Sequence, residues 1–70
     1  MNLKNNQITV GELLDYQPAR EVVQKHFPMV MRHPFLGAAR SVTLEQVIAL
    51  AGNTVPQKKI QQTLNELRSV

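Results

Sequence analysis

Residues 43–52 read Thr-Leu-Glu-Gln-Val-Ile-Ala-Leu-Ala-Gly, and this stretch contains the signals for both ends of an amphipathic helix. Thr43 and Gln46 fit a capping box, in which the hydroxyl accepts a hydrogen bond from the backbone N–H three residues on while the longer side chain reaches back. Gly52 stands where a C′ glycine often ends a helix. The apolar residues that recur at helical spacing along one face are Leu44, Val47, Ile48 and Ala51.

The segment that follows predicts a second, longer helix. Residues 54–57, Thr-Val-Pro-Gln, fit another capping box with proline in the first turn, where its missing N–H costs no hydrogen bond. Apolar residues then recur at helical spacing down to about Arg68. We expect these two helices to supply the densest part of the core. The residues expected there are Leu44, Val47, Ile48, Ile60, Leu64 and Leu67.

Toward the N-terminus, threonine and proline mark the ends of shorter helices. Residues 9–12, Thr-Val-Gly-Glu, fit a capping box and predict a helix that ends near Tyr16. Pro18 opens the next helix, which must end at Phe27 because Pro28 disfavours the helical conformation of the residue before it. Residues 29–31 could add one turn, and residues 35–39 suggest a short turn or loop.

These signals predict an all-α fold, a compact orthogonal bundle of about five short helices in a single domain that spans residues 8–70. Residues 1–7 show no periodicity and are expected to form a flexible lead-in. Residues 8–10 are β-branched but too short to pair alone, and no second alternating run exists to receive them.

The composition excludes several classes of protein. The 70 residues contain no Cys, which rules out disulfides and thiolate metal sites and is compatible with a reducing cytosol. No apolar run approaches the roughly 20 residues of a membrane span, and the N-terminus lacks the apolar stretch of a signal peptide. We therefore expect a soluble, cytoplasmic protein that does not act at a membrane.

The order of these signals resembles a family of small bacterial helical domains of unknown function, number 1858. The residues that carry the resemblance are 8–14 (Ile-Thr-Val-Gly-Glu-Leu-Leu), Tyr16 with Pro18, the helix that closes on Phe27, residues 42–44 and residues 64–65. The resemblance implies the helical bundle but no activity. Similar modules accompany redox or iron-handling enzymes and some hydrolases, and many redox-linked members carry cysteines after the helix that ends like Phe27. This chain has none, so thiol or iron chemistry does not transfer.

Catalytic and metal-binding chemistry has few candidate residues. His26 and His33 are the groups that ordinarily titrate near neutrality, but Pro28 breaks the helix between them and no acid in that segment completes a ligand set. No nucleophile elbow or phosphate-binding loop is present. We expect no enzyme activity, no cofactor and no metal site.

The leading functional hypothesis is a non-catalytic module that binds a protein partner or a second copy of itself. It rests on the apolar run at residues 27–31, Phe-Pro-Met-Val-Met, which is too long to point entirely into a small core. One interpretation is an exposed patch or shallow groove; the other is a loop folded under itself. The candidate partner-binding residues are Phe27, Met29, Val30, Met31, Arg32, Phe35 and Arg40.

The alternative hypothesis is a weak nucleic-acid-binding domain. The net charge is +3, and basic residues gather in the middle of the chain, where they could meet on one face and contact phosphates. The residues concerned are Arg20, Lys25, Arg32, His33 and Arg40.

Overall fold

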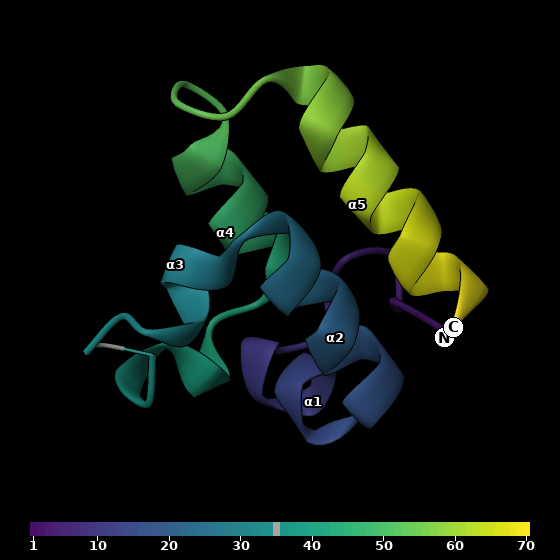
Figure 1. Cartoon of the computed structure of the whole chain (residues 1–70), viewed down its shortest axis with the longest axis vertical. Helices are drawn as coiled ribbons and strands as arrows, with labels where there is room; N and C mark the ends of the chain where they lie inside the picture. The colour runs from purple at the N-terminus through teal and green to yellow at the C-terminus, as the bar shows by residue number, and fades with distance from the viewer. Residues whose placement is uncertain (35) are drawn as a thin grey trace.

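The computed structural model describes residues 1–34 and 36–70, and these fold into a small all-α bundle (Figure 1), as the sequence predicts. The five α-helices are joined by short connections, and one 3-10 turn, η1, precedes α4. Their bounds are α1 Val10–Asp15, α2 Gln17–His26, α3 Pro28–Met31, η1 Ala38–Ser41, α4 Leu44–Ala51 and α5 Gln57–Ser69.

Two of the three predicted threonine caps are confirmed. Thr9 Oγ1 accepts a hydrogen bond from the backbone N–H of Glu12 at 3.2 Å, and Thr43 with Gln46 forms both bonds of the capping box. The two caps also lie side by side, because Thr9 and Thr43 form an isolated antiparallel β-bridge. Residues 8–10 therefore do find a pairing partner, which the sequence analysis did not anticipate.

The cap interactions predicted for Gly52 and Thr54, between α4 and α5, are wrong. Thr54 does not cap α5; its hydroxyl donates to the carbonyl oxygen of Ala51 at 3.3 Å, and Pro56 occupies the N-cap position without a side-chain hydrogen bond. Gly52 has φ −58°, a right-handed helical value open to any residue, and so is not the left-handed glycine expected there. α4 nevertheless ends at Ala51, where the sequence predicts its end, and the chain leaves it through ordinary turns.

The core is aliphatic and lies between α1, α2, α4 and α5. Leu67 is 1% exposed and Ala19 is fully buried. Val47 and Ile48 of α4, expected in the densest core, are exposed and half-buried, respectively. The residues that form the buried cluster are Leu3, Ile8, Leu13, Ala19, Val22, Leu44, Ile60, Leu64 and Leu67.

The N-terminal segment belongs to the bundle, whereas residues 1–7 were expected to form a flexible lead-in. Leu3 is 5% exposed and sits in the core. The terminal amine of Met1 donates to carbonyl oxygens at the end of α5, including that of Leu67 at 3.0 Å. A left-handed turn at residues 4–6 redirects the chain into Ile8. The sequence carries no periodic signal for this packing because one buried leucine defines no period.

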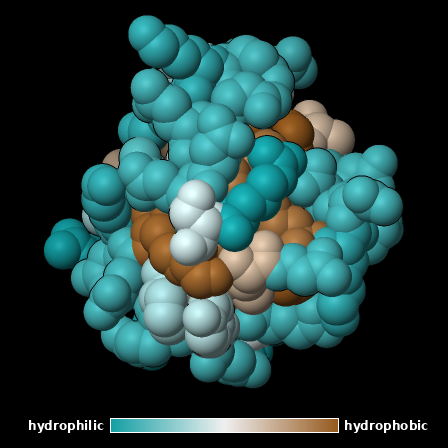
Figure 2. Space-filling view, turned by 90° about the vertical axis from the view of Figure 1, so that its right-hand side faces the viewer, coloured by the Kyte–Doolittle hydropathy of each residue, from teal (hydrophilic) through white to brown (hydrophobic). Residues whose placement is uncertain are grey.

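No helix in the described part of the chain has the length and hydrophobicity needed to cross a bilayer; α5, the longest, has 13 residues. On the face that lies to the right in Figure 1, hydrophobic side chains reach the surface in the middle of a hydrophilic surround (Figure 2).

Candidate partner-binding surface

An apolar groove of about 200 Å³ runs into the bundle between the α2–α3 corner, α4 and α5. Thr63 is the one polar residue among those that line it. The lining residues are Val10, Leu13, Leu14, Val23, Phe27, Val30, Leu44, Val47, Ile48, Ala51, Val55, Ile60, Thr63, Leu64 and Leu67. We refer to this set as the apolar groove.

The groove exists because α4 is incompletely covered. Its apolar stripe begins in the core at Leu44, which is 8% exposed, but Val47 one turn later is 36% exposed. The element opposite is α3, a single turn of four residues with no buried side chain, and it is too short to cover the rest of the stripe. The outer surface of α4 also carries an exposed apolar side chain, since Leu50 is 80% exposed.

The structure places two of the seven predicted partner-binding residues in the groove. Phe27 is half-buried on its wall, and Val30 is 41% exposed beside it. Met29 is 82% exposed on the outer side of α3, so this part of the run is a surface patch and not a loop folded under as core. Met31 is half-buried and Arg32 is exposed, and neither lines the groove. Phe35 lies outside the described residues.

Arg40 has a different place from the one predicted. Its guanidinium donates to Asp15 Oδ1 at 2.6 Å and reaches the carbonyl oxygen of Gly11 at 3.4 Å. These contacts hold η1 against α1, and Arg40 is not among the residues that line the groove. Arg40 therefore connects two elements of the bundle, and no local sequence pattern could indicate this contact because Asp15 lies 25 residues away.

One cation is in direct contact with the groove wall. Lys59 Nζ lies 5.1 Å from the centre of the Phe27 ring, within the range of a cation–π interaction. The contact joins the first turn of α5 to the end of α2 and keeps a positive charge beside the half-buried aromatic ring.

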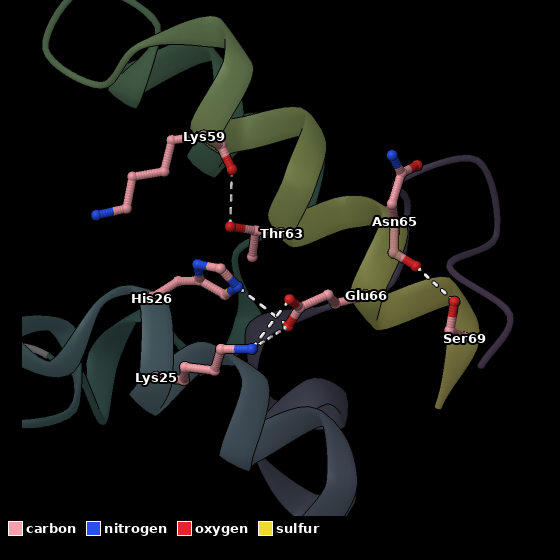
Figure 3. Close-up of polar contacts among 7 residues, drawn as sticks. All are labelled: Lys25, His26, Lys59, Thr63, Asn65, Glu66 and Ser69. Atoms are coloured by element: carbon pink, nitrogen blue, oxygen red, sulfur yellow. Dashed lines mark hydrogen bonds and ion pairs between the residues drawn. The ribbon is translucent and has the colours of Figure 1, made fainter.

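A polar cluster also joins α2 to α5 (Figure 3). Lys25 Nζ donates to Glu66 Oε1 at 3.1 Å, and His26 Nε2 lies 3.0 Å from Glu66 Oε2. The His26 contact has the distance of an ion pair without the direction of a well-formed hydrogen bond. Lys25 first, and His26 second, lower the pKa of the Glu66 carboxyl below its ordinary 4.5.

The cluster is relevant to a catalytic or metal-binding role of His26. His26 has a carboxylate neighbour that the sequence analysis missed, because Glu66 comes from another helix. Nevertheless, the described residues contain no group of three or more His, Cys, Asp or Glu side chains that could hold a metal ion. The same contacts occupy Lys25, so part of the predicted basic middle is neutralised within the chain.

Comparisons of the chain with family models, with curated proteins and with solved structures found no match. The resemblance to the helical family described above therefore stays a prediction.

Proposed function

We propose that the chain is a non-catalytic interaction module that binds a protein partner through the apolar groove. The observation that carries this proposal is a groove lined almost entirely by apolar side chains, with Val30 and Val47 exposed at 41% and 36% on its two walls. Leaving large apolar side chains in water lowers stability unless another surface covers them for part of the time.

The size of the groove favours a protein over a small molecule as its occupant. Small-molecule sites usually have volumes of roughly 300–1,000 Å³, whereas this groove measures about 200 Å³. A space of this size suits a few aliphatic side chains that project from a larger surface. The exposed Met29 and Leu50 beside it extend the apolar area, and methionine adapts well to different partners.

Affinity capture tests the proposal. The tagged chain and its Val30→Asp variant would be incubated with lysate of the source cell, with and without nuclease and at two salt concentrations. We expect the parent chain to retain a protein after nuclease and in high salt, and the variant to lose it. Loss of all captured material on nuclease or salt treatment would instead favour nucleic-acid binding, because phosphate contacts weaken steeply with salt.

A further inference from the structure

The charges near the apolar groove are unevenly matched. Acids on the elements that line the groove have partners within the chain: Asp15 pairs with Arg40 at 2.6 Å and Glu66 with Lys25 at 3.1 Å. Glu12 pairs with Lys4 at 3.6 Å. The two remaining acids of these elements, one on α2 and one on α4, accept from the side-chain amides of Gln17 and Gln7, respectively. The acidic groups around the groove are therefore already engaged.

Two exposed cations near the groove lack such partners. Lys59 lies against Phe27, and Arg32 follows Val30 by two residues at the end of α3. Within residues 1–34 and 36–70, neither forms an ion pair with an acid. The elements that carry Phe27, Val30 and Ile60 thus also bear uncompensated positive charge.

This charge distribution disfavours a second copy of the chain as the occupant. Each copy carries a net charge of +3, and a symmetric contact through the groove would bring the same cations together. Like charges facing each other across an interface cost affinity, whereas opposite charges select and orient the partner.

The backbone around the groove favours a helical occupant. Helices border it, and their backbone N–H and C=O groups bond within the helix, so they offer no open edge to which a strand could add. A bound segment must then satisfy its own backbone hydrogen bonds, and an α-helix does so while it presents apolar residues at three-to-four spacing.

We propose, on the basis of the interaction function above, that the apolar groove binds an amphipathic α-helix with an aliphatic face and an acidic flank. Its aliphatic side chains pack between Phe27 and Val30 on one side and Val47 on the other. Its carboxylates lie near Lys59.

Two synthetic peptides provide the direct test. Both have leucines at helical spacing over about four turns, and they differ only in bearing Glu or Lys on the flanking positions. Fluorescence anisotropy would measure affinity, and amide NMR shifts would locate the binding site. We expect the Glu peptide to bind at least about tenfold more tightly than the Lys peptide, less so as salt rises, and to shift the amides of Val30, Val47 and Val55.

Matched variants separate the groove from the nearby surface. Val30→Asp should weaken binding of the Glu peptide at least about tenfold because it places a charge against apolar side chains. Gln24→Asp, at an exposed position of α2 that does not line the groove, should change it less than about twofold. Replacing Lys59 with Gln should weaken binding more than replacing Arg20 with Gln. Circular dichroism of each variant would verify that it folds.

The outcomes distinguish this inference from the broader function. If lysate capture succeeds but the Glu peptide fails to bind, or binds no better than the Lys peptide, the acidic-helix inference is overturned and the interaction function stands. The acidic-helix inference is also overturned if the chain self-associates and this prevents the Glu peptide from binding. It is likewise overturned if the Glu peptide causes no amide NMR shifts and an oligonucleotide shifts the amides of Arg20 and Lys25. If neither peptide nor lysate protein binds, both proposals fail.

Discussion

Gly11 lies against η1 with no space for a side chain. A Cβ atom built there would lie 3.0 Å from the carbonyl oxygen of Arg40 and 3.2 Å from its Cβ. Alanine normally stabilises a helix by up to about 1 kcal/mol relative to glycine, but overpacking costs about 1–3 kcal/mol. We expect Gly11→Ala to lower the free energy of unfolding by about 1 kcal/mol, measured by urea denaturation.

Gly37 provides the matched control for that prediction. Its φ is −59°, and a Cβ there would meet no atom within 4 Å, so Gly37→Ala should be neutral or slightly stabilising. If the two variants unfold at the same urea concentration, η1 can yield to the extra methyl group and the close packing of α1 on η1 is not a constraint.

The roles of single residues could be predicted where their interactions are local in the sequence. Thr9 and Thr43 cap helices through bonds that span three residues, so a short sequence pattern contains the whole interaction. Thr54 has the same pattern, yet its hydroxyl bonds backward to Ala51 because tertiary packing sets where α5 begins. Leu3 is buried by residues distant in sequence, and no local rule could identify it.

At the scale of elements, Glu66 joins α5 to α2 in a pH-dependent way. Its pKa lies below 4.5 in the folded chain, chiefly because Lys25 donates to the carboxylate. A carboxyl group with a depressed folded pKa contributes stability above its unfolded pKa, and this contribution is lost as pH falls through the folded pKa. The contribution is small because the pair is exposed and screened by salt.

Glu66→Gln should therefore lower the melting temperature slightly at about pH 7 in low salt, and the difference from the parent should close by about pH 3. Thermal melts across this pH range would measure it. Glu21→Gln is the control, since within the described residues the carboxylate of Glu21 forms no ion pair and accepts from the side-chain amide of Gln17 at 3.4 Å. A difference that stays constant across the pH range would show that the carboxylate charge is not the cause.

The element that carries the candidate site was predicted, but its exposure was not. The stripe from Leu44 to Ala51 marks α4 as amphipathic, and periodicity alone assigns that stripe to the core. How much of it is covered depends on the length of α3, which Phe27 and the turns after Met31 limit to four residues. The groove is thus a consequence of a short neighbour, which the sequence of α4 cannot show.

At the scale of the whole molecule, the first seven residues act as part of the core. Removing them would delete Leu3, uncover Ile8 and Leu67, and remove the amine that bonds to the end of α5. Loss of one buried leucine typically costs about 2–5 kcal/mol, and a domain this small rarely has more than about 3–5 kcal/mol to lose. A chain that starts at Ile8 should be largely unfolded at 25 °C.

Circular dichroism melts would test this, with Leu3→Ala as a second variant that keeps the backbone intact and should still lower stability by about 2–5 kcal/mol. A cooperative melt of the truncated chain near that of the full chain would restore the prediction of a dispensable lead-in.

The contact between Met1 and the last turn of α5 has a topological consequence, because the two ends of the chain lie together (Figure 1). A few glycines linking residue 70 to residue 1 would convert the chain into a ring without moving a helix. Ring closure removes conformational entropy from the unfolded state, by up to about 4 kcal/mol for a loop of this length. The ring could then be opened between α4 and α5 to give a circular permutant that begins with α5, in which the same contacts form from a different order of helices.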